Sequence, residues 1–473
     1  MDEKRLEQLT VALNRLLYDQ SIGLPFQEEQ ANALAVQLKN EYRQALDEPA
    51  CRDWALDGLA DMQSARWLQR LSEKVDSVLA VPEIAVHGEI ATCHNWKHME
   101  RELPAAARRK LFAEFVSRSV ELACLIEEHY TTLRRSYADH GTMPLQIFAH
   151  REGTTPEAIR ALALAIGQVC REPFEAALKD MARQVFGSDR VSAPELRALY
   201  LNRMYEPLAP LFATRDALAD ARATFAGLGF DIDHVSLDVQ DRPKKYAGAF
   251  CFPVQIPGDV RISVRPASPH HLADMLFHEF GHAVHFSGID PTLSFADRYW
   301  VHTGRHETIA TLFESLLGLP GFLSDQLGLN EQATRQLVVF DRFKNLITGT
   351  WLVAEGLTVC DAWMEHLTWT QIEQRYAQYC EQFTGIAMPP GFARLDLYVS
   401  RVDSYVLGYI MAAVRVAYWL EEMQTDWGVR WWADERAGQA IRERIRLGGA
   451  LKFEDEWLDP APFARHWGAS ADR

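Results

Sequence analysis

Two histidines and a glutamate stand at a spacing that could hold a catalytic metal ion. The stretch His278-Glu279-Phe280-Gly281-His282 is an HExxH motif. Positions i and i+4 share one face of a helix, so both imidazoles can reach one ion, and Glu279 lies beside the open coordination position. Zinc hydrolases need this arrangement, with the carboxylate as general base on an activated water. His278 and His282 are therefore predicted zinc ligands, and Glu279 is the predicted base.

A third ligand is expected from Glu307, which lies 25 positions after His282. Two histidine nitrogens, one carboxylate oxygen and one water make a tetrahedral catalytic zinc site with an open position. Without a metal, Glu307 would be an ordinary acidic residue stabilised by the dipole at a helix N-terminus. The hypothesis is one Zn²⁺ per chain, held by His278, His282 and Glu307.

Ligand imidazoles usually donate their second nitrogen to a carboxylate, and two residues compete for that role. Glu314 lies seven positions after Glu307, on the same face of the expected helix. Asp274 precedes His278 by one helical turn. For each of the two, the alternative is a solvated surface carboxylate.

The elements that position these groups are predicted to be two helices. Ser268-Pro269 is a helix start, with a capping hydroxyl followed by proline at the first helical position, and Gly288 is a natural stop. His278 and His282 therefore sit well inside a helix. A second apolar-periodic segment, Glu307–Leu317, places Glu307 in the first turns of a following helix.

Most of the remaining chain also has helical periodicity, over residues 1–47, 64–78 and 105–129. Thr155 and Ser192 each precede a proline-containing helix start. The character changes over residues 203–265, where residues 241–252 and 255–264 favour a β-hairpin turning at Pro257-Gly258.

The fold class is therefore predicted to be mainly α: a large two-lobed helical protein with a small β-hairpin or sheet near the active-site cleft. Residues 1–200 are expected to form an N-terminal helical lobe, and residues 201–473 the catalytic lobe. A single intertwined domain is the alternative.

Composition excludes several classes of protein. The 473 residues carry a net charge of −16 and no dense Lys/Arg run, which argues against a nucleic-acid partner. No apolar stretch is long enough to span a membrane, and the N-terminus has no apolar signal core. The seven cysteines are widely spaced, without a CxxC pair, and are expected to be reduced thiols in a cytoplasmic protein.

Three segments resemble the thimet oligopeptidase and oligoendopeptidase F family: Tyr246–Cys251, His278–His285 and His306–Glu314. A second resemblance, to the carboxypeptidase Taq family, rests on Gly258–Arg265, His306–Thr308 and Tyr405–Gly408. Both are families of helical, gluzincin-type metallopeptidases. Both resemblances imply zinc bound by HExxH and a glutamate on a following helix, here Glu307, and the carboxypeptidase family further implies a homodimer.

The oxyanion of a peptidase intermediate needs hydrogen-bond donors, and two tyrosines are candidates. Tyr405 and Tyr409 are spaced i, i+4 around Gly408, so both phenols share one helix face. Tyr409 also matches the Gly-Tyr tyrosine of the oligopeptidases. The alternative is that both are core or rim aromatics.

Five further residues are candidate substrate contacts. His306 and His302 flank the predicted third ligand, with buried structural histidines as the equal alternative. Arg261, Arg265 and Arg401 could hold a peptide carboxylate through a bidentate fork, with solvated or salt-bridging roles as the default.

The sequence thus predicts a zinc-dependent peptidase that cleaves short peptides. A metallocarboxypeptidase that releases C-terminal residues is the second hypothesis, because the two resembled families differ in cleavage mode. A third hypothesis is a helical binding protein with a vestigial metal site, although such a protein would have no reason to keep Glu279.

Overall fold

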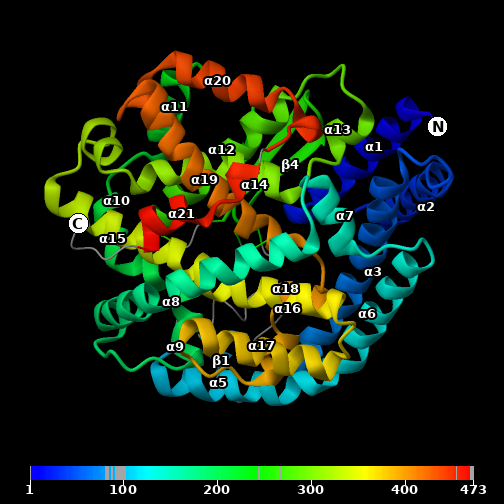
Figure 1. The fold of residues 1–473 in the computed structure, drawn as a ribbon, viewed down its shortest axis with the longest axis horizontal. Helices are drawn as coiled ribbons and strands as arrows, with labels where there is room; N and C mark the ends of the chain where they lie inside the picture. The colour runs from blue at the N-terminus through cyan, green and yellow to red at the C-terminus, as the bar shows by residue number, and fades with distance from the viewer. Residues whose placement is uncertain are drawn as a thin grey trace. The chain divides into compact units, whose positions relative to one another are not determined.

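The computed structural model describes residues 2–79, 85–86, 89–90, 103–201, 203–242, 245–246, 248–265, 268–453 and 455–468. Helices dominate these residues, accompanied by a three-stranded sheet and a two-stranded pair (Figure 1). The predicted mainly α fold with a small sheet is confirmed. Within the described ranges, no helix is long and apolar enough to cross a membrane.

The chain divides into two compact units, each drawn from three stretches of sequence. Unit 1 comprises Met1–Leu59, Leu208–Arg342 and Met411–Trp457. Unit 2 comprises Ala60–Pro207, Phe343–Ile410 and Leu458–Arg473. Three of these boundaries fall inside α-helices, namely α3 (Arg52–Leu79), α15 (Glu331–Ile347) and α19 (Tyr405–Trp427).

Unit 1 contains the predicted metal motif and the three-stranded sheet. Besides its parts of α3, α15 and α19, its helices are α1 (Glu3–Ser21), α2 (Glu28–Ala45), α10 (Ala209–Phe212), α11 (Ala217–Gly227), α12 (Pro269–Gly288), α13 (Phe295–Tyr299), α14 (Thr303–Glu314) and α20 (Glu435–Ile445).

Unit 2 is a helical assembly with the two-stranded pair β1 (Ala85–Val86) and β2 (Glu89–Ile90). Its remaining helices are α5 (Ala105–Arg118), α6 (Ala123–Ala138), α7 (Pro144–Arg151), α8 (Pro156–Phe186), α9 (Ala193–Tyr200), α16 (Val353–Met364), α17 (Trp369–Thr384), α18 (Leu397–Arg401) and α21 (Pro460–Phe463).

The helix starts expected from the sequence are present. Thr155 caps α8 by accepting from the Ala158 N–H, and Ser192 forms a capping box with Glu195 at the start of α9. Ser268 caps α12 by accepting from the His271 N–H. Each cap satisfies amide groups that the first helical turn leaves without partners, which is why these sequences begin helices.

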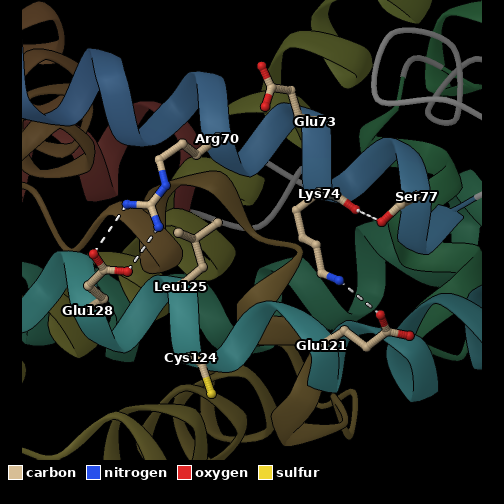
Figure 2. Close-up of a pocket in the computed structure, with 8 residues that line it drawn as sticks. All are labelled: Arg70, Glu73, Lys74, Ser77, Glu121, Cys124, Leu125 and Glu128. Carbon is tan, nitrogen blue, oxygen red and sulfur yellow. Dashed lines mark hydrogen bonds and ion pairs between the residues drawn. The ribbon is translucent and has the colours of Figure 1, made fainter.

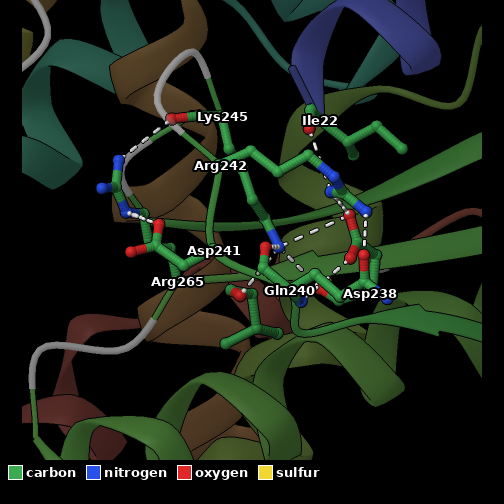
Figure 3. A network of polar contacts seen from close by, with 8 residues as sticks. Ile22, Asp238, Gln240, Asp241, Arg242, Lys245 and Arg265 are labelled. Carbon is green, nitrogen blue, oxygen red and sulfur yellow. Dashed lines mark hydrogen bonds and ion pairs between the residues drawn. The ribbon is translucent and has the colours of Figure 1, made fainter. Parts of the chain in front are cut away.

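The sheet of unit 1 has strand order β3-β5-β4, with β3 (Ser236–Asp238) parallel and β4 (Ala249–Gln255) antiparallel to β5 (Asp259–Val264). The predicted hairpin is therefore confirmed, with its turn at the expected Pro257-Gly258. Its first strand begins at Ala249 and not at Asp241. Asp241 instead pairs with Arg265, and the Nζ of Lys245 donates to three backbone carbonyls, so these two residues are held outside the strand (Figure 3).

The side chains of β4 alternate between the two faces of the sheet. Phe250, Phe252 and Val254 pack on Tyr18 and Ile22 of the N-terminal segment. Alternate residues of a strand point to opposite faces, so Cys251 belongs to the other face. Helix α12 packs against both β4 and β5.

In unit 2, the carboxylate of Asp361 on α16 is fully buried and joins three helices. It accepts hydrogen bonds from Arg160 Nε of α8 at 2.7 Å and from the Tyr379 hydroxyl of α17 at 2.6 Å, and it also pairs with Arg375. A buried carboxylate is tolerated only with such partners, so this network ties α8, α16 and α17 together.

The described cysteines are free thiols, as expected. Cys170, Cys360 and Cys380 are buried, Cys51 and Cys251 are half-buried, and Cys124 is exposed. Cys93 lies outside the described residues.

Candidate metal centre

Helices α12 and α14 pack directly against each other and carry the four residues of the predicted centre. The two backbones approach closely at Gly281, where an added Cβ would lie 2.7 Å from the Cα of Ala310. Only a residue without a side chain permits backbones to approach this far. Gly281 lies inside the HExxH motif, so the close approach occurs where the ligands are carried.

The three predicted ligands converge. Glu307 Oε2 lies 3.4 Å from His278 Nε2 and 3.5 Å from His282 Nε2. One ligand atom from each of the three residues lies within 4.8 Å of the others. Metal–ligand bonds of about 2.0–2.1 Å at tetrahedral angles place neighbouring ligand atoms roughly 3.3 Å apart. The distances to Glu307 therefore suit a tetrahedral metal site.

The charge and burial of Glu307 also suit a cation bound between His278, His282 and Glu307. Glu307 is 2% exposed, and apart from the two imidazoles its Oε2 has no polar partner among the described residues. Burial alone would raise the pKa of Glu307, but the imidazoles of His282 and His278 outweigh it and hold that pKa well below its usual range. A buried, ionised carboxylate oxygen requires a positive partner, which a metal ion would supply.

Glu314 contacts the ring of His278, the first predicted ligand. Its Oε2 lies 2.7 Å from Nδ1 of His278, which leaves Nε2 facing Glu307. Glu307 and Glu314 lie on the same helix, α14, so one element supplies a candidate ligand and the group that holds another in place. Asp274, the competing candidate, is buried on α12, but Nδ1 of His278 is directed to Glu314.

Glu279 is 7% exposed and has one carboxylate oxygen, Oε2, without a hydrogen-bond partner in the described chain. The backbone N–H of Cys251 on β4 donates to the Glu279 carboxylate. Burial raises the pKa of Glu279, opposed by His278 and His282 and reinforced by Glu307. A fixed carboxylate with a raised pKa and a free oxygen can accept a proton and release it again.

Of the two flanking histidines, His306 lies beside a predicted ligand. The ring of His306 is 5.0 Å from that of His282, and burial lowers the pKa of His306 to about 3. His306 is therefore neutral at physiological pH. His302 is the residue immediately before α14 and is half-buried.

Arg261 and Arg265 are both engaged in local ion pairs. Arg261 forms a two-pronged pair with Asp259 at 2.7 and 2.8 Å. Arg265 pairs with Asp241 at 2.8 Å and donates to the Lys245 carbonyl at 3.3 Å. Both arginines therefore form salt bridges, which was the alternative role expected from the sequence. Their role in binding a peptide carboxylate stays a prediction.

The tyrosine pair and Arg401 belong to unit 2. The Tyr405 and Tyr409 hydroxyls lie 3.4 Å apart on one face of α19, as their spacing predicted. Arg401 pairs with Asp403 at 2.5 Å and lies over the Tyr405 ring. Their proposed roles towards an oxyanion and a substrate stay predictions.

Two features of the centre were not singled out from the sequence. Gly281 allows α12 and α14 to pack closely, and the signal for it in the sequence was a glycine in the interior of a helix. The amide of Cys251 holds Glu279, and a backbone contact of this kind leaves no signature in residue types.

A surface pocket of about 540 Å³ lies along α3 and α6 in unit 2 (Figure 2). Arg70 pairs with Glu128 and Lys74 with Glu121, each at 3.1 Å, and the exposed Cys124 lies beside them. Both cationic side chains of the lining, Arg70 and Lys74, are thus engaged in ion pairs. None of the predicted site residues lines this pocket.

No protein-family model matches the sequence. No curated protein matches it either.

Solved structures do share the fold. Metallocarboxypeptidase 1 of Trypanosoma cruzi is 16% identical with a TM-score of 0.59, and the match covers 98% of this chain and 99% of that one. The M32 carboxypeptidase of Deinococcus radiodurans is 17% identical with a TM-score of 0.55, over 99% and 95% of the two chains.

A protein assigned as oligoendopeptidase F is 15% identical with a TM-score of 0.62, and the match covers 93% of this chain and 85% of that one. The fold that the motifs implied is thereby confirmed. It is shared with carboxypeptidase structures and with an oligoendopeptidase F structure, which correspond to the two families that the sequence resembles. At these identities the likeness establishes the fold and leaves the reaction to be argued from the residues.

Proposed function

We propose that this protein is a zinc-dependent peptidase that hydrolyses short peptides. The observation that carries the proposal is the buried triangle of His278, His282 and Glu307, with ligand distances suited to a tetrahedral ion. Beside it lies Glu279 with a free carboxylate oxygen. A site built only for structure would fill all four positions with protein ligands, whereas three ligands leave one position open for reaction.

His278, His282 and Glu307 would hold the metal, which when bound supplies Lewis-acid polarisation of a peptide carbonyl and an activated water. Glu279 would accept the water proton at Oε2 and later deliver it to the leaving amine. The Cys251 amide keeps the Glu279 carboxylate oriented, and its raised pKa suits a group that must both take and give a proton. Glu314 keeps the His278 ring directed at the metal position.

A metallocarboxypeptidase is the second candidate function. It is favoured by the match with the T. cruzi metallocarboxypeptidase, which covers nearly the whole of both chains. The pairing of Arg261 and Arg265 with aspartates weighs against it, because neither guanidinium is then available for a peptide C-terminus without exchanging partners.

The test is mass spectrometry of the products that the zinc-loaded protein makes from short synthetic peptides with free or amidated C-termini. Internal fragments from both forms are expected for the oligopeptidase. Release of single C-terminal residues, abolished by amidation, would establish the carboxypeptidase instead. If the protein binds one zinc ion per chain but cleaves no peptide, both peptidase proposals are overturned. The remaining hypothesis is then a non-catalytic binding protein.

We also propose a cytoplasmic protein that acts as a homodimer. The free thiols of the described cysteines suit a reducing compartment. The homodimer rests on the resemblance to the carboxypeptidase Taq family alone, and light scattering of the purified protein tests it.

A further inference from the structure

Strand β4 is held by two helices, α1 and α12. Helix α1 packs on the side chains of Phe250, Phe252 and Val254, whereas Glu279 of α12 binds the backbone N–H of Cys251. Within the sheet, β4 lies at one edge, because the strand order is β3-β5-β4. An edge strand is paired with another strand on one side only, so its position also depends on what covers it.

The unpaired edge of β4 carries the contact with the candidate base. The Cys251 N–H is given to Glu279 and is therefore directed away from β5. Pro253 lies two residues further along the strand, so its carbonyl is expected at the same edge. The register of β4 on β5 then shifts between Pro253 and Gln255, so regular pairing ends close to this carbonyl.

Helix α1 binds that carbonyl directly. Asn14 Nδ2 donates to the Pro253 carbonyl at 3.1 Å. One turn later in the helix, Tyr18 packs edge-on against Phe250 and Phe252, with ring centroids 6.3 and 5.9 Å away. Asn14 thus fixes the edge of the strand, and Tyr18 fixes its face.

The first half of α1 is fastened to the residue that follows β4. Glu7 forms a two-pronged ion pair with Arg298 at 2.9 and 2.8 Å, and it accepts from the Tyr299 hydroxyl at 3.1 Å. The Tyr299 hydroxyl accepts the Ile256 N–H at 3.2 Å, and Arg298 donates to the Ile256 carbonyl at 3.4 Å. Arg298 is 8% exposed, so its pairing is shielded from water and well defined in geometry.

The end of α1 is fastened to residues that precede β4. The N–H of Tyr246 donates to the Ser21 carbonyl at 3.0 Å. Arg242 donates to the carbonyl of Ile22 at 3.0 Å (Figure 3). The contacts of α1 therefore follow β4 in reverse order, from its start to its end, and the helix supports the strand along its whole length.

We propose that Asn14 is a positioning residue for Glu279, acting through the backbone of β4. The inference rests on the proposed peptidase function and adds a residue of α1 to its machinery. Asn14 and Glu279 bind backbone groups two residues apart on one strand, so loss of the Asn14 bond lets the Cys251 N–H move away from the Glu279 carboxylate. A small displacement of a catalytic group is enough to slow a reaction.

The first test measures the Cys251 amide without any substrate. Hydrogen–deuterium exchange of the zinc-loaded protein, followed by mass spectrometry of β4 fragments, compares the wild type with Asn14→Asp. This variant keeps the side-chain size but places a carboxylate beside the Pro253 carbonyl. Exchange at Cys251 is expected to become about tenfold faster, as for the loss of one hydrogen bond, while the amides of α14 keep their wild-type rates.

Gln8→Glu is the matched control, since it makes the same chemical change at an exposed position of α1. It should leave exchange at Cys251 unchanged. Wild-type exchange at Cys251 in Asn14→Asp overturns the positioning role. Equal acceleration at Cys251 and throughout α14 also overturns it, because the variant would then only destabilise unit 1.

The second test separates positioning from substrate binding. On a short peptide, Asn14→Asp is expected to lower kcat about tenfold with KM and zinc content unchanged, because only the base is displaced. Asn14→Ala removes the donor without adding a charge and should lower kcat less. An unchanged kcat, or a change in KM alone, overturns the positioning role. Faster exchange at Cys251 in a protein that cleaves no peptide supports the link from Asn14 to Glu279 and overturns the peptidase.

Discussion

Gly281 of α12 lies directly against the backbone of Ala310 of α14, within the candidate metal centre. A Cβ on Gly281 would lie 2.7 Å from the Cα and 3.2 Å from the carbonyl oxygen of Ala310. Backbone atoms cannot rotate out of the way as side chains do. The distance between α12 and α14, and hence the reach of Glu307 to the two histidines, depends on the absence of a side chain at this position.

Replacing Gly281 by alanine should therefore separate the helices. We expect a loss of about 1–3 kcal/mol in the free energy of unfolding, the usual cost of overpacking a filled core. We also expect weaker zinc binding, because Glu307 Oε2 would move away from His278 and His282. Urea denaturation and competition with a chelator measure the two effects.

Gly258→Ala is the matched control, since nothing lies within 4 Å of a Cβ at that position. If Gly281→Ala bound zinc as tightly as the wild type, the close packing of α12 on α14 would not be what sets the ligand distances.

Glu279→Gln tests the base. The amide is almost the same size and can still accept the Cys251 N–H, but it cannot take up a proton. We expect unchanged zinc content and a fall in kcat of about 10²–10⁴-fold, the usual contribution of a positioned acid or base. Metal analysis and steady-state kinetics give the two numbers. Near-normal turnover in the variant would remove Glu279 from the mechanism.

Glu314→Gln tests the carboxylate that holds His278. Loss of this kind of partner typically weakens metal binding by about 10–100-fold, because the ring is less well oriented and less basic. Zinc affinity in a chelator series measures the effect. Glu28→Gln, at an exposed position of α2, removes the same charge without touching the centre. Equal affinities in the two variants would contradict the role of Glu314.

The sequence predicts the parts of this centre that depend on local rules. Helix caps at Thr155, Ser192 and Ser268 follow from side chains that bind the first amides of a helix. The ligand spacing in HExxH follows from helical periodicity, and Glu314 falls on the face of α14 that its spacing from Glu307 implies.

The remaining features depend on contacts between residues far apart in the sequence. The amide of Cys251 reaches Glu279 only because β4 packs on α12. Lys245 looks like a surface lysine in the sequence, and only the carbonyls of three separate segments explain its burial. The chain also passes between its two units inside helices α3, α15 and α19, where no loop composition marks a boundary.

His129 in unit 2 should make stability depend on pH. It is 3% exposed and stacks on Trp67, with ring centroids 4.1 Å apart. Burial, aided by the charge of Arg401, lowers its pKa from 6.5 to about 4. Between these two values the unfolded chain binds a proton that the folded chain does not, so stability is full above about pH 6.5 and falls as pH drops towards 4.

The largest loss from His129 alone is about 3 kcal/mol, at roughly 1.4 kcal/mol per unit of pKa shift. His129→Phe keeps a flat ring against Trp67 and cannot be protonated. Urea denaturation of both proteins across this pH range should show a shallower decline for the variant, with the two curves differing most near pH 4. Parallel curves would mean that His129 is protonated equally in the folded and unfolded chains, because every other titrating group is common to both proteins.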